Sequence, residues 1–440
     1  MLFHGAIEMS FNTLFASLLL LVSLNCSYAQ QSTTTFTPAQ LREDFSQLYQ
    51  NLQSGSYDLF AHYPQVHYDR DYQNFLAALE QPLTKLEAQK LFMRFVALAR
   101  IAHTRIDFPV ADYRSFLENS GKTLPFDLRI HTEGVFIYEG EQAVYRMTLR
   151  DAQSQEIYTV TQPTLAQKDQ LQSVTDASTA ERKLRDYEVR ADGIGYLKPG
   201  PFYNIYASSD AEVWDTTEFH SFIDEAFTAL KQAEVTRVLI DLRGNPGGTN
   251  SFSDHMLAWI ADQPFKFASD FRVKVSPLAR QANQQRLQGN PTAGDTSLQL
   301  EDFYARHQEG DIISFPLADT PPHGATKSMA GTEVFILVDR YSFSNAVSVA
   351  SIAQDYGFAT VIGEKTADLA TTYAAMEHFT LRHTGIEVGF PKAHIIRPNG
   401  DLKADGVTPD ISFSFGTAKN GAKTELERVI DLIQQETLNH

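Results

Sequence analysis

Two short apolar segments, residues 238–242 (VLIDL) and 334–338 (VFILV), constrain the fold of this chain more than any other part of its sequence. Each segment runs into a polar turn, and each turn is followed by a segment with helical spacing. Apolar runs of this length, with a third one at residues 358–363 (FATVIG), are typical of strands buried on both faces. Because these strands alternate with helices, the sequence predicts an α/β fold with mostly parallel strands.

The helices of this part of the chain are expected at about residues 218–232, from near Ser251, after Ser344 and at about 424–434. Their apolar residues recur at the spacing that places them on one face of a helix. The helix after Ser344 ends before Gly357, and glycine suits the left-handed position that closes a helix.

The N-terminal part of the chain, residues 30–106, predicts a separate helical module. Thr37 and Pro38 provide an N-cap and a first-turn proline, and an amphipathic segment follows them. Thr84 and Glu87 have the spacing of a capping box ahead of a further helix.

Two regions lack this regular alternation. Residues 107–189 predict a small β-rich connecting region, with the best strands at 135–138 and 157–160. Residues 281–320 are polar and acidic, which indicates a loop-rich excursion on the surface. The remaining divisions are an α/β domain over 190–415 and a C-terminal helix within 416–440.

Residues 1–29 have the features of a signal peptide, with an apolar run too short to span a bilayer and small residues at Ser27 and Ala29. We therefore expect an exported protein, periplasmic or secreted, with no membrane span in the mature chain. The single cysteine, Cys26, lies in this leader, which excludes a disulfide framework and a cysteine-based zinc site. The net charge of −17, without any basic run, argues against nucleic-acid binding.

The glycine-rich turn after the first buried strand is the first candidate for chemistry. Gly244, Gly247 and Gly248 leave backbone N–H groups uncovered just before a helix, so the turn can bind negative charge. Neither G-x-x-x-x-G-K-[ST] nor G-x-G-x-x-G is present, which argues against nucleotide binding. The turn can hold a transient oxyanion, or it can be only a tight connection between strand and helix.

The second candidate is Ser344, which lies at the start of a helix, where the helix dipole stabilises developing negative charge. A serine at this position more commonly serves only as an N-cap. A nucleophilic serine needs a base, and His103 and Lys365 are the two candidates. His103 follows a predicted helix C-terminus, where capping the last carbonyls is the simpler role. Lys365 acts as a base only if burial lowers its pKa.

The sequence contains no metal motif, since the order H-E-x-x-H is absent, and it implies no cofactor. Four segments, in order and spacing, resemble the tail-specific (C-terminal processing) serine peptidases: residues 238–248 (VLIDLRGNPGG), 338–344 (VDRYSFS), 363–366 (GEKT) and 406–410 (GVTPD). The resemblance covers roughly residues 190–415. It implies a ClpP/crotonase-like spiral core, peptide-bond hydrolysis, Ser344 as the nucleophile, and an oxyanion hole from the amide of Asn345 and the loop at Gly247 and Gly248.

The resemblance also bears on the base. In the Ser-Lys branch of the family the lysine falls near position 369, which is Leu369 here. The branch similar to the tricorn core protease and the interphotoreceptor retinoid-binding proteins has a histidine ahead of the catalytic domain, and Ala102-His103-Thr104 resembles that segment. This favours His103 as the base over Lys365. Asp405 is the nearest carboxylate to the family's acidic position, where Lys403 stands.

These observations predict an exported serine endopeptidase that acts on a peptide or an unfolded protein. A PDZ module is not expected, because residues 141–192 contain no glycine for a carboxylate-binding loop. The alternative is a non-hydrolytic protein of the same fold that binds a hydrophobic ligand or a peptide. The sequence does not indicate an oligomeric state.

Overall fold

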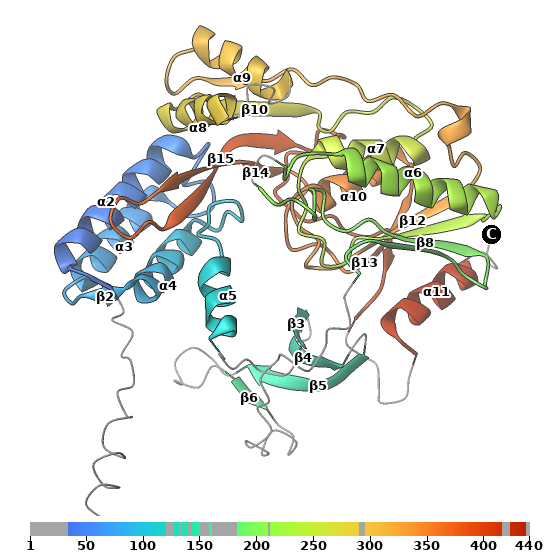
Figure 1. The fold of residues 1–440 in the computed structure, drawn as a ribbon, viewed down its shortest axis with the longest axis horizontal. Helices are drawn as coiled ribbons and strands as arrows, with labels where there is room; N and C mark the ends of the chain where they lie inside the picture. The colour runs from blue at the N-terminus through green and yellow to red at the C-terminus, as the bar shows by residue number, and fades with distance from the viewer. Residues whose placement is uncertain are drawn as a thin grey trace, which may run out of the picture.

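The structure is a computed structural model, and it describes residues 34–119, 127–131, 134–139, 142–149, 158–160, 183–209, 212–289, 295–415 and 423–436. The predicted signal peptide, residues 1–29, lies outside the described residues. The described chain is a mixed α/β structure (Figure 1). Within those residues, no helix has the length and apolar character needed to cross a membrane.

A six-stranded sheet forms the centre of the α/β part, in the order β16-β13-β12-β9-β8-β7. In this sheet β8, β9, β12, β13 and β16 pair with their neighbours in parallel, whereas the edge strand β7 is antiparallel to β8. The predicted buried strands occupy its middle, and β9 lies beside β12 with Ile240 opposite Ile336. The bounds are β7 (Asp186–Val189), β8 (Ile194–Lys198), β9 (Arg237–Asp241), β12 (Glu333–Val338), β13 (Thr360–Gly363) and β16 (Ile411–Ser412).

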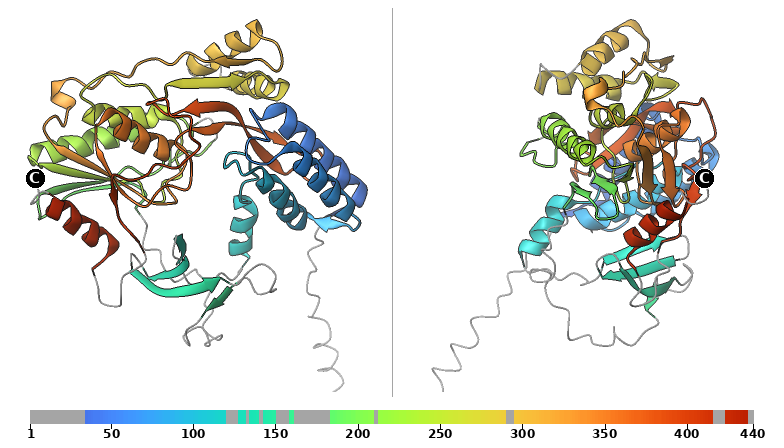
Figure 2. Two further views of the ribbon diagram at one scale, coloured as in Figure 1. Left: turned by 180° about the vertical axis from the view of Figure 1, so that it is seen from behind. Right: turned by 90° about the vertical axis from the view of Figure 1, so that its right-hand side faces the viewer.

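Helices cover both faces of this sheet, as the two views of Figure 2 show. On one face, α6 (Thr217–Gln232), α7 (Asn250–Ile260) and α10 (Asn345–Tyr356) bury their apolar sides against the strands. On the other face, α11 (Glu425–Glu436) packs its buried residues against β9, β12 and β13. Gly357 ends α10 with a φ of 77°, as its sequence position predicts.

A second, antiparallel sheet lies beside the first, in the order β11-β10-β15-β14. It consists of β10 (Asp270–Lys274), β11 (Ile312–Ser314), β14 (Thr372–Thr380) and β15 (Glu387–Ile396). Its strands β14 and β15 form the long hairpin labelled in Figure 1. This hairpin matters for the site, because it extends from the α/β part to the N-terminal helices.

The prediction of a loop-rich excursion at 281–320 is wrong. The structure has two helices there, α8 (Pro277–Gly289) and α9 (Asp295–Arg306), followed by β11. Few apolar residues hold these helices in place: Ala279, Leu300 and Tyr304 are buried in a small cluster with Val273 of β10. So narrow an apolar stripe, surrounded by Gln, Asn and Asp, leaves only a weak helical signal in the sequence.

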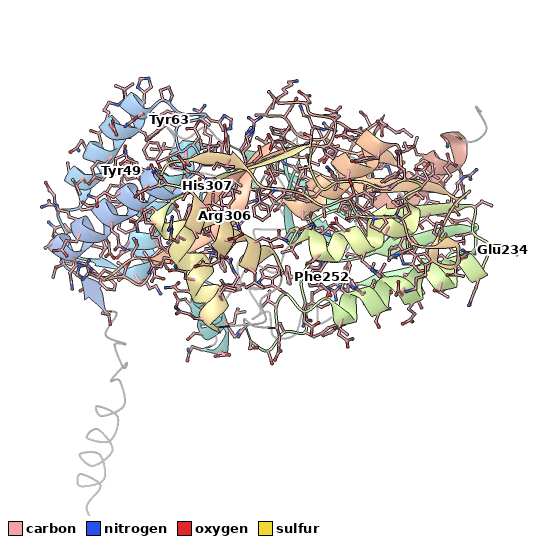
Figure 3. All side chains as sticks on the ribbon, turned by 90° about the horizontal axis from the view of Figure 1, so that it is seen from above. Tyr49, Tyr63, Glu234, Phe252, Arg306 and His307 are labelled. Carbon is pink, nitrogen blue, oxygen red and sulfur yellow. The ribbon has the colours of Figure 1, made fainter. Side chains whose placement is uncertain are left out.

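The N-terminal helices are α2 (Pro38–Gly55), α3 (Gln65–Ala78) and α4 (Lys85–Val96). The predicted cap at Thr37 and the capping box at Thr84 and Glu87 are both confirmed. The helices share a core with the hairpin of β14 and β15, including Phe379 and Phe390. Figure 3 shows Tyr49 on these helices and Phe252 on α7, at separate parts of the molecule.

Within residues 107–189, the structure describes a helix, α5 (Val110–Glu118), that the sequence did not predict. A four-stranded antiparallel sheet follows, with β3 (Asp127–His131), β4 (Gly134–Glu139), β5 (Gln142–Leu149) and β6 (Tyr158–Val160) in order. The strand expected at 135–138 lies within β4. The described part of the strand expected at 157–160 is β6.

Candidate active site

The parallel pairing of β9 and β12 brings their two polar turns to the same edge of the sheet. Asp339 joins the turns, because its Oδ1 accepts hydrogen bonds from the N–H of Gly244 at 3.0 Å and from those of Tyr341 at 3.0 Å and Ser342 at 2.8 Å. Asp339 is buried, so these bonds replace its hydration. One carboxylate therefore fixes the glycine-rich turn against the turn that carries Ser344.

Further contacts bring Ser344 close to the glycines. The Ser342 hydroxyl donates to the carbonyl of Leu242 at 2.8 Å, and the Phe343 N–H donates to the carbonyl of Asn245 at 3.0 Å. Gly247 has a φ of 86°, and a Cβ added there would lie 2.8 Å from the Cβ of Ser344. Only glycine fits so close an approach. Because β9 and β12 are neighbours in the sheet, Ser344 lies beside this loop.

Ser344 itself stands at the N-cap of α10 with φ 53° and ψ −121°. A non-glycine residue in this region of φ is uncommon, and such residues cluster at functional sites. The Ser344 hydroxyl accordingly lies at the positive end of the helix dipole. Its backbone N–H donates to Asp368 Oδ2 at 2.7 Å.

His103 lies against this serine, although 241 positions separate the two residues in the sequence. Its Nε2 is 3.1 Å from Ser344 Oγ. Two backbone hydrogen bonds between Arg105 and Gly389 of β15, at 3.1 and 2.8 Å, hold the segment that carries it. The imidazole also stacks on the ring of Phe343, with the ring centres 5.0 Å apart. The hairpin thus connects the N-terminal helices to the turn that carries Ser344.

The surroundings of His103 favour the neutral imidazole. Burial lowers the pKa of His103, and the nearby charge of Asp368 opposes this effect without cancelling it. A neutral ring can accept a proton from the serine through Nε2. The backbone of Tyr373 also raises the pKa of His103. Among the described residues, however, no group meets the geometry of a hydrogen bond to His103 Nδ1.

The amides that could stabilise an oxyanion differ in their availability. The N–H of Gly247 donates to Asn245 Oδ1 at 2.9 Å. For the N–H groups of Gly248 and Asn345, no partner is found in the part of the chain that the structure describes. The Asn345 side chain donates to Ser253 Oγ at 2.8 Å, so this contact engages the side chain and not the backbone N–H of Asn345. Gly248 and Asn345 are therefore the better candidates for donors.

Lys365 and Asp405 form an ion pair with each other, and the structure does not bring either of them to Ser344. Lys403 binds the same carboxylate at 3.0 Å. Hydrogen bonds from Lys365 and Lys403 lower the pKa of Asp405 to about 2. The Lys365 side chain is 48% exposed and bound to Asp405, so it is not the buried lysine that a role as base requires.

Asp368 is the site residue that the sequence reasoning missed. It is buried, it accepts the N–H of Ser344, and its charge acts on His103. Its other oxygen, Oδ1, has no hydrogen-bond partner among the residues described. Asp368 follows the end of β13, and β13 pairs in parallel with β12. A carboxylate after that strand was therefore a candidate for the same sheet edge.

A cavity of about 470 Å³ opens beside these residues. Its walls are mostly apolar, with one basic and one acidic residue, and are formed by Ala102, Gly244, Pro246, Arg340, Tyr341, Phe343, Ala367 and Asp368. Ala102 precedes His103 in the chain, Phe343 precedes Ser344, and Asp368 accepts the N–H of Ser344. A substrate bound in the cavity would therefore lie next to the serine.

Comparison with known proteins identifies the class. The model of peptidase family S41 matches residues 194–413, which is half of the chain, and the protein belongs to that family. The residues matched contain Ser344 and the glycine-rich turn, whereas His103 precedes them. The predicted membership of the tail-specific peptidases is confirmed.

Solved structures show the same fold at low sequence identity. Mature CPAF in complex with lactacystin is 12% identical, with a TM-score of 0.59 over 92% of this chain and 99% of that chain. A second solved structure, from Parabacteroides merdae ATCC 43184, is 15% identical, with a TM-score of 0.50 over 89% of this chain and 96% of that chain. No curated protein matches this sequence.

Proposed function

We propose that this protein is an exported serine endopeptidase in which Ser344 is the nucleophile and His103 is the general base. The observation that carries the proposal is the 3.1 Å contact between Ser344 Oγ and His103 Nε2, two residues drawn together from separate parts of the fold. Membership of a peptidase family supports the reaction class. The apolar cavity beside the serine supports a peptide or an unfolded protein as the substrate.

In the proposed mechanism His103 Nε2 takes the hydroxyl proton while Ser344 Oγ attacks the peptide carbonyl. The amides of Gly248 and Asn345 donate to the oxyanion of the tetrahedral intermediate. When the intermediate collapses, the peptide C–N bond breaks and the imidazolium gives its proton to the leaving amine. Water then hydrolyses the acyl-enzyme, with His103 again as the base.

Asp368 replaces Asp405 in this proposal as the carboxylate that serves the site. It acts at a distance on the imidazolium that forms during the reaction, since its charge favours the protonated ring. The proposed arrangement of the chain keeps the divisions expected from the sequence. These are a signal peptide at 1–29, a helical module at 30–106, a connecting region at 107–189, a ClpP/crotonase-like spiral core at 190–415 and a terminal helix within 416–440.

One observation favours the alternative of a non-hydrolytic binding protein. No acidic side chain accepts from His103 Nδ1 among the described residues, so the ring lacks the partner that fixes its tautomer in a Ser-His-Asp triad. In that case the cavity would hold a hydrophobic ligand or a peptide without cleavage. The two functions differ in a single measurable property, the turnover of a peptide bond.

The test is hydrolysis of a fluorescently labelled, unfolded casein by the wild type and by Ser344→Ala. We expect the variant to lose at least about 1000-fold in rate with an unchanged circular dichroism spectrum. Ser348→Ala, one turn further along α10, is the matched control and should keep its activity. Equal activity in Ser344→Ala and wild type would contradict the proposal. A folded but inactive wild type would favour the binding protein.

A further inference from the structure

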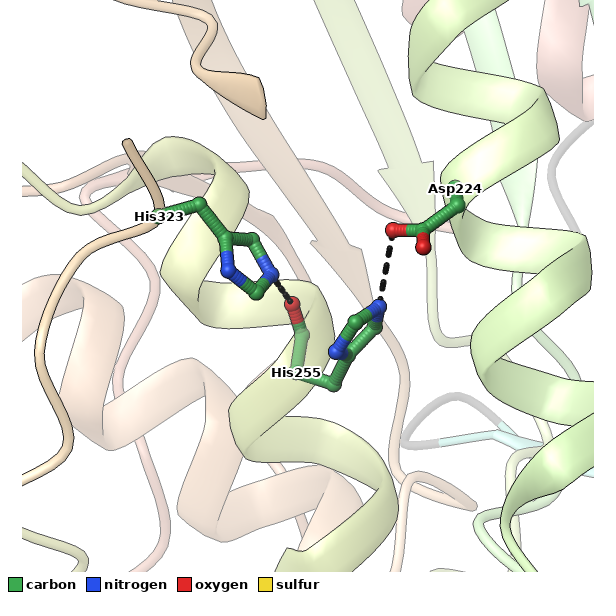
Figure 4. A group of neighbouring side chains, drawn as sticks. All are labelled: Asp224, His255 and His323. Atoms are coloured by element: carbon green, nitrogen blue, oxygen red, sulfur yellow. Dashed lines mark hydrogen bonds and ion pairs between the residues drawn. The ribbon is translucent and has the colours of Figure 1, made fainter. Parts of the chain in front are cut away.

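A second group of imidazole and carboxylate side chains lies on the face of the sheet covered by α6 and α7. Asp224 belongs to α6, His255 to α7, and His323 to the loop before the short 3₁₀ helix Ala325–Lys327 (Figure 4). One potential ligand atom from each residue lies within 4.8 Å of those of the other two. All three residues are partly exposed, so an ion from solution can reach them.

Contacts within the group and around it hold the three side chains. Within the group, His255 Nε2 lies 2.8 Å from Asp224 Oδ1. From outside the group, Trp259 Nε1 donates to the same oxygen at 2.9 Å. His323 is fixed twice, because its backbone N–H donates to Ala258 O at 2.9 Å and its Nε2 lies 3.0 Å from His255 O. Such outer contacts orient the ligands of metal sites.

Aromatic contacts further fix the His255 ring. His220, one turn before Asp224 on α6, stacks on His255 with ring centres 4.0 Å apart. The ring of His323 meets the His255 ring edge-on, with centres 4.7 Å apart. The two neighbouring rings thus hold His255 beside Asp224.

We propose that Asp224, His255 and His323 form a binding site for one Zn²⁺ ion, with water as the fourth ligand. Two imidazole nitrogens and one carboxylate oxygen match the ligand types and the number of protein ligands in an open tetrahedral zinc site. Ligand atoms around one such ion stand roughly 3.4 Å apart, from Zn–N and Zn–O distances of about 2.0–2.2 Å. The candidate ligand atoms lie within 4.8 Å of one another, so binding would require only a small approach of these partly exposed side chains.

Lys327 forms an ion pair with one of the proposed zinc ligands. Its Nζ lies 2.6 Å from Asp224 Oδ2, so the lysine ammonium group occupies one side of the carboxylate. The lysine side chain is 49% exposed and can move into solvent. Zinc binding requires this displacement, because a divalent ion and an ammonium group beside the same carboxylate repel each other. Lys327 is therefore expected to weaken zinc binding.

The bound ion would link α6, α7 and the loop that carries His323. Its ligands come from two helices and from the loop that leads toward β12, and none of them belongs to the turns around Ser344. Binding would stabilise the folded state over the unfolded chain, which holds no preformed site. The inference does not depend on the proposed peptidase activity.

The test is isothermal titration of tag-free protein, first treated with a chelator, with ZnCl₂ near neutral pH. We expect saturable binding of one ion per chain. Asp224→Asn and His323→Gln should each weaken it at least about 100-fold, whereas Lys327→Ala should strengthen it about tenfold. His103→Ala is the control for zinc at the serine site and should bind as the wild type does. Circular dichroism of each variant confirms folding.

A second measurement uses CoCl₂, whose visible absorption reports tetrahedral coordination. The wild type should show these bands, and His255→Gln should lose them while the exposed control His67→Gln keeps them. Absence of saturable zinc binding by the wild type would overturn the proposal. So would binding that is unchanged in Asp224→Asn and His323→Gln, binding that is lost in His103→Ala, or weaker binding in Lys327→Ala.

Discussion

His103 and His255 are both imidazoles with a carboxylate nearby, but the two rings have different partners. His103 is 2% exposed, its Nε2 faces the Ser344 hydroxyl, and no acceptor binds its Nδ1 within the described chain. His255 is partly exposed, and its Nε2 faces the carboxylate of Asp224, with two further imidazoles against the ring. A histidine whose ring nitrogen faces a serine hydroxyl is a candidate base, whereas one whose ring nitrogen faces a carboxylate, beside further imidazoles, is a candidate metal ligand.

The two rings also differ in how the fold delivers them. His255 lies on α7 and meets Asp224 on the neighbouring helix α6. His103 belongs to the N-terminal helical module, and backbone hydrogen bonds between its segment and β15 hold it beside Ser344. A change that disturbs the hairpin of β14 and β15 should therefore affect the serine site before it affects the histidine cluster.

The largest expected effect separates the two candidate bases. His103→Ala should lower the rate of casein hydrolysis at least about 1000-fold, because it removes the imidazole that lies 3.1 Å from Ser344 Oγ. Lys365→Ala should lower it less than about threefold, since it removes only an exposed ion pair with Asp405. Rates measured under the same conditions give the answer. Equal effects of the two substitutions would show that His103 is not the base.

The next effect concerns the alignment of the two turns. Asp339→Ala removes the acceptor of three backbone N–H groups, so hydrolysis should fall about ten- to hundredfold and the melting temperature should drop. Asp339→Asn keeps an oxygen in the same place and should retain most of the stability. If alanine and asparagine have the same effect, the carboxylate does not hold the turns through these bonds.

A smaller effect tests the charge near His103. Because burial lowers the pKa of His103 from 6.5, the acid limb of kcat/KM should have its midpoint below pH 6.5. Asp368 raises that pKa, so Asp368→Asn should move the limb to still lower pH and reduce the rate at neutral pH about three- to tenfold.

Asp405→Asn is the matched control for this measurement, since its carboxylate is bound by two lysines away from the serine. Its acid limb should coincide with that of the wild type. A limb that moves to higher pH in Asp368→Asn, or that moves equally in both variants, would contradict the role assigned to Asp368.

Much of the fold could be predicted from local patterns. The apolar runs at 238–242 and 334–338 became the neighbouring central strands β9 and β12, and the caps at Thr37 and Thr84 start helices. The helices α8 and α9 were missed because their apolar stripe is narrow. Local patterns determine an element only where burial demands many apolar residues.

The candidate site was predictable in part, for a physical reason. Ser344 and the loop at Gly247 follow adjacent strands, so strand pairing alone brings them together. The position of His323 depends on contacts between distant segments, and this residue carries no local signal of its own. Asp368 follows β13, the strand that pairs with β12, so only its place after a buried strand marked it as a candidate. The link between His103 and Ser344 came from a family resemblance, and the 3.1 Å distance gives it a geometric basis.

A fluorophosphonate probe reports whether His103 activates Ser344. Such a probe reacts with a serine made nucleophilic by a base. Peptide mass spectrometry should find the adduct on Ser344 of the wild type, and His103→Ala should lose this labelling while remaining folded. An unlabelled wild type, or equal labelling of Ser344 in wild type and His103→Ala, would contradict the account.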